Sequence, residues 1–213
     1  MRVLDREGIA ALLDAARPRY RLLLATALFT GLRLGELLGL TWADIDLKAG
    51  VIRVRKQLAR EGNRVKPKTP RALRDVILMP ALAHLLREHR LASPYSQDEE
   101  FVFASARGTP LLPRNVERRG LHVAAEGARL NGNGRPNLRF HDCRHTFASL
   151  LIAEGLNVVY VSHQLGHADP AITLRVYAHL FDAAEHAQRA TEALEARFGK
   201  SLASSGGNGG ERS

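Results

Sequence analysis

The stretch Val51-Ile52-Arg53-Val54-Arg55 alternates apolar and basic side chains, and a period of two residues is typical of a β-strand with one buried face. A second β-rich run, Val76-Ile77-Leu78, follows further along the chain. Between the two runs, Glu61-Gly62-Asn63 has the composition of a hairpin turn. The segment 51–78 is therefore predicted to form a small antiparallel sheet.

Outside this segment the apolar residues recur with the spacing of amphipathic helices. Helices are expected after the capping residue Asp5 and over residues 18–29, 33–40, 80–91, 113–130 and, in three or four segments, 141–198. Residues 42–46 are expected to form a turn, and residues 101–103 a short strand. The sequence thus predicts an α+β fold that is mostly helical, with one small antiparallel sheet.

The charge balance favours a polyanionic partner. The 213 residues include 31 Lys and Arg against 22 Asp and Glu, which gives a net charge of +9 and a pI near 10.4. Basic side chains that neutralise phosphates release condensed counterions, so this balance is typical of proteins that bind nucleic acid. A soluble protein that merely happens to be basic is the alternative interpretation.

Size, cysteine content and hydropathy limit the other classes. The length fits one domain of ordinary size, or one domain plus a small appendage. The single cysteine, Cys143, excludes an internal disulfide and a thiolate metal cluster. The chain has no run of 18 apolar residues and no apolar signal core at its N-terminus, so we expect a cytoplasmic protein without a membrane partner.

Two clusters in the second half of the chain have side chains suited to phosphate chemistry. On a helix, His141 and Arg144 project from one face, and an arginine offers a planar fork of donors to two phosphate oxygens. Gly166 is expected to end a short helix and direct His167 out of it, and Tyr177 follows ten residues later. The structural alternatives are an exposed basic patch and a tyrosine used only for packing.

Two further clusters lie in the first half. Arg33 and Glu36 are expected on one helical face, where the alternative is a simple surface ion pair of little energetic value. Lys68 precedes the returning strand, where a lysine at a hairpin is usually just solvated. Each of these signals is weak when taken alone.

Their order along the chain is far more specific. Arg33, Lys68, His141, Arg144, His167 and Tyr177 together resemble the signature of the tyrosine recombinase (phage integrase) family. The resemblance runs from about residue 3 to residue 198, the family's catalytic domain. The surrounding words also resemble the family: Thr-Gly-Leu-Arg-Leu-Gly-Glu at 30–36, His-Asp-Cys-Arg-His-Thr-Phe-Ala-Ser at 141–149 and Gln-Leu-Gly-His at 164–167.

The resemblance implies a site-specific DNA recombinase that cleaves and rejoins strands. In the family a tyrosine hydroxyl attacks the scissile phosphodiester, which gives a 3′-phosphotyrosyl link and a free 5′-hydroxyl. A 5′-hydroxyl from a partner strand then reverses the step. Because the link conserves the energy of the broken bond, neither ATP, nor a metal, nor any other cofactor is expected. By resemblance, Tyr177 is the nucleophile.

The same resemblance assigns the charge-stabilising residues. Arg33 and Arg144 would clamp the non-bridging oxygens, where charge builds up in the transition state, and His167 would add a third donor. Glu36 matches an acidic position that the family uses to support the site without reacting.

The proton-transfer residues are assigned in the same way. His141 would accept or donate a proton near the nucleophile. Lys68 would protonate the departing 5′-oxygen. Lys66 is the alternative for this role, because it lies only two residues away on the same side of an extended strand.

The expected organisation is a catalytic domain over residues 1–198 and a disordered Gly/Ser-rich tail over residues 199–213. The N-terminal DNA-clamping domain usual in the family is expected to be absent, which would impair site recognition. Double-stranded DNA is the expected partner. Apolar residues from Leu180 to Phe198 fall on one helical face, which in the family often packs on a neighbouring protomer of a tetramer; packing within the same chain is the alternative.

Three other interpretations compete with an active recombinase. A zinc protein is suggested by His141 with His145 and by His163 with His167, both spaced i, i+4, although Arg144 beside the first pair would repel a cation. A DNA-binding remnant of an integrase would keep the fold without catalysis. A type IB topoisomerase would use similar chemistry, but the Leu-Gly-His and Thr-Gly-x-Arg words resemble integrases.

Overall fold

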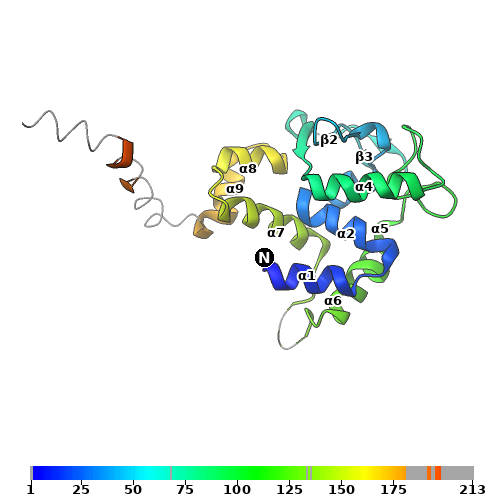
Figure 1. Ribbon diagram of the computed structural model, residues 1–213, viewed down its shortest axis with the longest axis horizontal. Helices are drawn as coiled ribbons and strands as arrows, with labels where there is room; N and C mark the ends of the chain where they lie inside the picture. The colour runs from blue at the N-terminus through cyan, green and yellow to red at the C-terminus, as the bar shows by residue number, and fades with distance from the viewer. Residues whose placement is uncertain are drawn as a thin grey trace, which may run out of the picture. The chain divides into compact units, whose positions relative to one another are not determined.

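The computed structural model describes residues 2–67, 69–132, 134, 136–180, 191–192 and 195–197. The chain divides into two compact units, residues 1–176 and 177–213. The helices, most of them in the first unit, are α1 Arg6–Ala15, α2 Pro18–Thr30, α3 Leu34–Leu38, α4 Pro80–Ala92, α5 Pro113–Asn115, α6 Val123–Gly127, α7 Phe140–Ala153, α8 Val158–Leu165 and α9 Pro170–Tyr177 (Figure 1). A π-helical segment, Val116–His122, joins α5 to α6.

The strands form two small antiparallel sheets, which confirms the predicted α+β class. They are β1 Ile45–Asp46, β2 Val51–Val54, β3 Gln57–Leu58, β4 Arg64–Val65 and β5 Arg74–Ile77. One sheet has the order β1-β2-β5 and the other pairs β3 with β4. As the alternation predicted, β2 and β5 are paired, with Ile52 opposite Val76. The turn predicted around Gly62 does not join these two strands but connects β3 to β4.

Two local predictions are wrong. Residues 42–46 do not form only a turn, because a 3₁₀ turn at Trp42–Asp44 is followed by β1. β1 was not predicted because two residues are too few to show the alternation of buried and exposed side chains that marks a strand. Residues 101–103 are not a strand: Phe101 makes an isolated bridge to Thr41, and the backbone N–H of Val102 donates to Leu40 O at 3.0 Å. Val102 and Phe103 are buried in the core without strand pairing, and the Phe103 ring stacks on His89 of α4, with ring centroids 6.0 Å apart.

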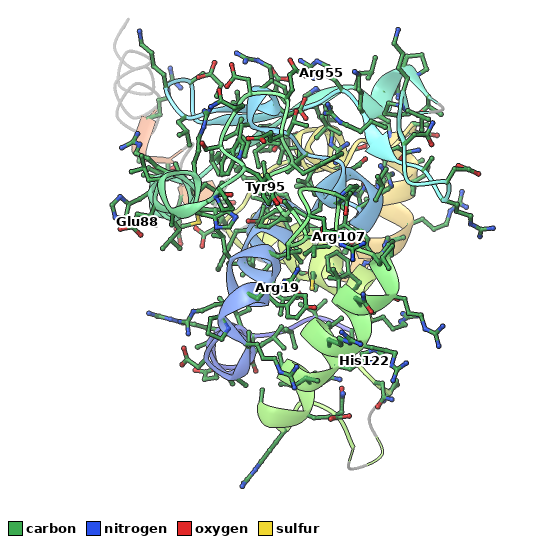
Figure 2. The ribbon with its side chains drawn as sticks, turned by 90° about the vertical axis from the view of Figure 1, so that its right-hand side faces the viewer. Arg19, Arg55, Glu88, Tyr95, Arg107 and His122 are labelled. Atoms are coloured by element: carbon green, nitrogen blue, oxygen red, sulfur yellow. The ribbon has the colours of Figure 1, made fainter. Side chains whose placement is uncertain are left out.

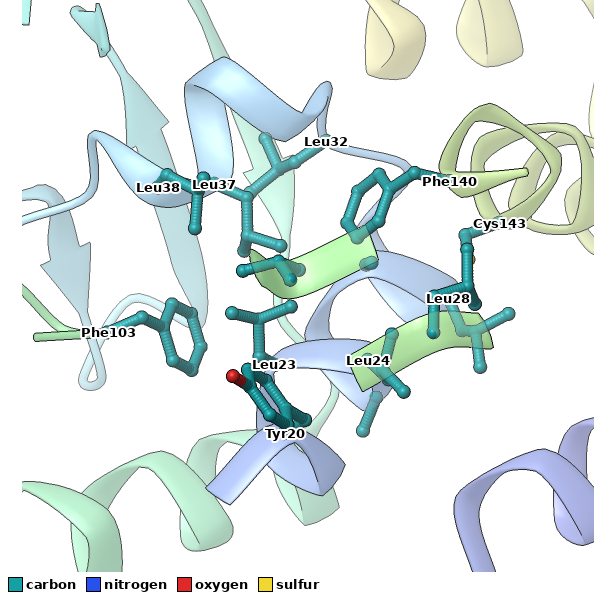
Figure 3. Packing of buried hydrophobic residues seen from close by; sticks show 14 of the residues in the cluster. Tyr20, Leu23, Leu24, Leu28, Leu32, Leu37, Leu38, Phe103, Phe140 and Cys143 are labelled. Carbon is teal, nitrogen blue, oxygen red and sulfur yellow. The ribbon is translucent and has the colours of Figure 1, made fainter. Parts of the chain in front are cut away.

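The core is built around α2, whose Leu23, Leu24 and Leu28 side chains are all fully buried. A helix that is apolar on most sides must be surrounded by other elements. Figure 3 shows Leu28 in this core together with Phe140 and Cys143 from α7. Exposed charged side chains include Arg55 by the sheet and Glu88 on α4 (Figure 2).

The helices that carry the candidate site continue from this core. α7 packs on α2, α8 packs on α7, and α8 also contacts β5 (Figure 1). Across the residues that the structure describes, we find no helix with both the length and the apolar character to cross a membrane.

Gly31 connects α2 to the loop that carries the first candidate site residue. It ends α2 in the left-handed conformation, with φ +61°, and a Cβ placed there would lie 2.4 Å from Cδ1 of Phe147 on α7. Gly31→Ala is expected to lower the free energy of unfolding by about 2–4 kcal/mol, because left-handed strain and overpacking add. Urea denaturation measures this loss.

Gly62→Ala is the matched control for Gly31→Ala. Gly62 also has a positive φ, +87°, but a Cβ there would meet nothing within 4 Å. It should therefore cost only the backbone strain, about 1–2 kcal/mol. If both variants lost the same free energy of unfolding, the contact with Phe147 would not be what restricts position 31 to glycine.

Candidate active site

The N-terminal turns of α7 carry His141 and Arg144, three residues apart as predicted. The helix begins with a reciprocal cap, in which the Asp142 carboxylate accepts the backbone N–H of Arg139 at 2.9 Å. This cap fixes the first turn, on which His141 is exposed while Arg144 is only 2% exposed. His145, one turn further on, meets His141 edge to face, with the ring centroids 4.7 Å apart.

The C-terminal turn of α8 presents His167. Gly166 adopts the left-handed conformation, with φ 62°, directly after the last helical residue, which confirms the predicted helix end. The backbone N–H of His167 donates to Ser162 O at 3.1 Å. Its Nδ1 pairs with Oγ1 of Thr173, on α9, at 2.8 Å. Nε2 is thus the ring nitrogen left to bind a further group.

Three arginines converge on the last carbonyl groups of α8. Arg74 Nε donates to Gln164 O at 2.7 Å, and Arg144 Nη2 donates to Leu165 O. Arg33 Nη2 donates to Gly166 O at 3.4 Å. Carbonyls at a helix C-terminus lack intrahelical partners and lie at the negative end of the helix dipole, so they suit guanidinium groups. This helix end therefore gathers positive charge from the residue before α3, from β5 and from α7.

Glu36 balances part of this charge. Its buried carboxylate accepts the backbone N–H and Nη1 of Arg33, both at 2.9 Å, and it accepts Nη1 and Nη2 of Arg74 at 3.0 and 2.9 Å. Burial raises the pKa of the Glu36 carboxyl, but the hydrogen bonds and charges of Arg74 and then Arg33 outweigh it and lower this pKa to about 2. Glu36 is ionised at neutral pH.

The contact between Arg33 and Glu36 differs from the predicted one. Residues 33–40 do not all form a helix, since α3 spans only Leu34–Leu38. Arg33 lies before α3 as its N-cap, with extended backbone, and Glu36 reaches back to it as the third helical residue. The pair is thus a capping contact, which leaves the Arg33 side chain 39% exposed.

Burial, together with nearby positive charge, keeps the imidazoles of this site neutral at neutral pH. Burial, followed by the charges of Arg144, Arg33 and Arg74, lowers the pKa of His167 to about 4. Burial, followed by the charge of His141, lowers the pKa of His145 to about 4. Burial and the charge of Arg144 also lower the pKa of His141. At neutral pH these rings can each donate one proton and accept another.

These shifts predict acid sensitivity. His145 and His167 have folded pKa values of about 4 against an ordinary value of 6.5, so the unfolded chain binds more protons between these limits. Stability should therefore be complete above about pH 6.5 and fall as the pH drops toward 4. The lowered pKa of Glu36 acts below pH 4.5, in a separate window. Urea midpoints measured from pH 7.5 to 4.8 test this.

His145→Gln should flatten that pH dependence, because it removes one of the three histidines whose pKa is lowered in the folded protein. His84→Gln, at an exposed position on α4, serves as the matched control and should keep the wild-type slope. The assignment is wrong if His145→Gln and the unchanged protein lose stability in parallel as the pH falls.

The structure brings some of the predicted site residues together but does not describe all of them. Arg33, Arg144 and His167 meet at the end of α8, with Glu36 behind Arg33. Lys68 lies outside the described residues, whereas the alternative, Lys66, is exposed just after β4. Among the described parts of the chain, no three His, Cys, Asp or Glu side chains are grouped to hold a metal ion.

Tyr177 is the last residue of α9 and the first residue of the second unit. Its side chain is only 1% exposed. The predicted helical pattern around it is confirmed. Most of the segment 181–198 and the whole tail 199–213 lie outside the described residues.

Sequence reasoning missed two residues, Arg74 and Gln164. Arg74 lies on β5 at an inward position, because burial along this strand alternates and Val76 is also buried. Arg74 and Val76 are two residues apart and therefore lie on the same face of the strand, so the sequence alone could have indicated that Arg74 is buried. Gln164 shows no such signal, since its role depends on the packing of α8 against β5.

The sequence pattern of the phage integrase family matches residues 2–184. A tyrosine recombinase XerC-like protein of Caldanaerobacter subterraneus subsp. tengcongensis is 33% identical over 185 residues, which cover 76% of this chain and 46% of the relative. The chain spans about half the length of the curated relatives it matches.

Solved structures agree in fold. The crystal structure of XerA recombinase has a TM-score of 0.66 at 25% identity, covering 90% of this chain and 65% of that chain. The Tn1549 transposon integrase in complex with circular intermediate DNA has a TM-score of 0.72 at 24% identity, covering 91% and 67%. The resemblance seen in the sequence motifs is confirmed, and the chain belongs to the phage integrase family.

Proposed function

We propose that this chain is the catalytic region of a site-specific DNA recombinase, which cleaves and rejoins DNA strands through a covalent bond between Tyr177 and a 3′-phosphate. The observation that carries the proposal is the meeting of Arg33, Arg144 and His167 at one helix end. Three basic groups from distant parts of the chain form a site suited to one phosphate. The net charge of +9 supports double-stranded DNA as the substrate.

The phosphate would be held by groups of different exposure. Arg33, with 39% of its side chain exposed, offers its guanidinium to a non-bridging oxygen, and His167 offers Nε2 to another. Arg144 is nearly buried, and its guanidinium is held by Gly31 O at 2.8 Å and by Leu165 O. Its fixed charge stabilises the transition state without any reorganisation.

The proposed reaction balances without a cofactor. The Tyr177 oxygen forms a bond to phosphorus while the bond from phosphorus to the 5′-oxygen breaks. The phenol proton passes to the neutral imidazole of His141, since a phenol with an ordinary pKa near 10 is protonated at neutral pH. Lys68, or Lys66 in its place, delivers a proton to the leaving 5′-oxygen. Attack by a partner strand's 5′-hydroxyl reverses these steps.

The proposal extends to organisation and partners. Rejoining to a partner strand requires two DNA sites to be held together. We propose that this occurs in a tetramer assembled on two DNA sites in the cytoplasm, with residues 1–198 as the catalytic region. The structure of the Tn1549 integrase in complex with DNA supports DNA as the partner, as do the pre-cleavage and post-cleavage crystal structures of XerH recombinase bound to its difH substrates.

Covalent capture tests the proposal. The protein is incubated with a pool of nicked duplexes of varied sequence, in which the nick lets the 5′-hydroxyl fragment diffuse away after cleavage. An adduct that survives denaturation, with the DNA 3′-phosphate mapped to the Tyr177 peptide, is the expected result. DNA binding without any adduct under these conditions would instead favour a non-catalytic DNA-binding protein.

A further inference from the structure

We propose that Arg74 is a positioning residue of the recombination reaction: it fixes Arg33 through Glu36 and fixes the turn that presents His167 through Gln164. The inference rests on the proposed function, since it concerns the same phosphate site. It adds a third arginine whose task differs from that of the two phosphate-binding ones.

Burial separates Arg74 from the groups that would touch DNA. Its side chain is 0% exposed, whereas the Arg33 side chain is 39% exposed. Its guanidinium donates to the two oxygens of Glu36, to Gln164 O at 2.7 Å and to Ala72 O at 3.1 Å. With these donors engaged and no exposed surface, Arg74 can act on a phosphate only through its neighbours.

The first connection runs from Arg74 through Glu36 to Arg33. One buried carboxylate accepts hydrogen bonds from both guanidinium groups, so its two oxygens are shared between them. Removing Arg74 would leave Glu36 buried with Arg33 as its only charged partner among the described residues. Glu36 would then draw the Arg33 guanidinium inward and take up a proton more readily.

The second connection runs from Arg74 to the end of α8. Its Nε donates to Gln164 O, and the Gln164 side chain binds β5 in return, accepting the Ile77 N–H at 2.9 Å and donating to Asp75 O at 3.4 Å. A Cβ added at Gly166 would lie 2.8 Å from Arg74 Nη1. The turn leading to His167 is therefore packed directly against this guanidinium.

The test compares Arg74→Gln, Arg74→Lys and the control Arg53→Gln. Arg53 also lies on a strand of the same sheet and pairs with a carboxylate, that of Asp46, but it touches none of the site residues. For each protein we would measure the first-order rate of adduct formation at saturating DNA, the DNA affinity and the melting temperature, from pH 5.5 to 8.5.

The expected result is a slower reaction with nearly unchanged DNA binding. Arg74→Gln should reduce the rate by about ten- to a hundredfold, as small displacements of positioned groups do, while affinity stays within about threefold. The rate of adduct formation by Arg74→Gln, relative to that of the unchanged protein, should fall further as the pH is lowered, because the Glu36 carboxylate then becomes protonated and no longer holds Arg33. Arg74→Lys should recover part of the rate and show no added pH dependence, and Arg53→Gln should match the unchanged protein.

Several outcomes would overturn the inference. It fails if Arg74→Gln reacts at the normal rate throughout this pH range, or if a fall in DNA affinity accounts for the whole loss. Should Arg74→Gln not fold, Arg74→Lys decides, and a normal rate in that variant rejects the inference. The absence of any adduct from the unchanged protein rejects the proposed function as well, whereas a normal adduct with insensitivity to Arg74 rejects only the inference.

Discussion

Tyr177→Phe is expected to abolish the covalent adduct between protein and DNA while leaving DNA binding nearly intact. The change removes the one oxygen atom that would bond to phosphorus, so the rate should fall by at least about 10³-fold, to the limit of detection. Only one oxygen is lost from a side chain that is 1% exposed, and the stability should therefore change by only about 1 kcal/mol. Denaturing gels of nicked-duplex reactions measure the adduct.

Tyr160→Phe is the matched control for Tyr177→Phe. Tyr160 lies on α8, is partly exposed and occupies no position of the family signature. Its variant should form the adduct at the normal rate. A persistent adduct in Tyr177→Phe would mean that another side chain is the nucleophile, and the proposed mechanism would have to be abandoned.

Arg144→Gln is expected to have the second largest effect, because it removes both charge and structural support. The Arg144 side chain, 2% exposed, donates to Gly31 O and Leu165 O and so joins α7 to the end of α2 and the end of α8. Cleavage should slow by about 10²–10³-fold, as when one donor to a developing oxyanion is lost. Two buried carbonyls left without donors should lower stability by about 2–4 kcal/mol.

Both consequences of Arg144→Gln can be measured separately. Urea denaturation gives the stability. Adduct formation is measured at about 15 °C, close to the temperature at which folded domains are most stable, so that the variant stays folded. Arg139→Gln, whose side chain is 67% exposed, is the control and should be close to normal in both assays. A stable Arg144→Gln protein with normal cleavage would contradict the role given to this guanidinium.

The sequence predicted the parts of the fold that follow from local patterns. Alternation at Val51–Val54 placed a strand, and Gly166 placed the end of a short helix, because each depends on neighbouring residues only. The chain order of basic residues then identified the cluster at the end of α8. The catalytic roles of all the predicted site residues remain predictions within the proposed mechanism: Arg33, Lys68, His141, Arg144, His167 and Tyr177.

The features that could not be predicted from the sequence depend on contacts between residues far apart in the chain or on the exact start of a helix. Helical periodicity does not distinguish a cap from the first helical residue, so Arg33 was expected inside α3. The role of Gln164 arises only when α8 meets β5, and no local pattern encodes that meeting. Arg74 could have been found, since a charged residue in phase with buried Val76 needs a buried partner.

The Gln164 side chain has a consequence for association between copies of the chain. In the sheet β1-β2-β5, strand β5 is an edge, and its outward backbone groups at Asp75 and Ile77 would otherwise be open to pairing with a strand from another molecule. Gln164 satisfies one acceptor and one donor of that edge with its own amide. Together with the packing of α8 on β5, this amide occupies the two backbone groups, so a strand from another molecule could pair there only by displacing it.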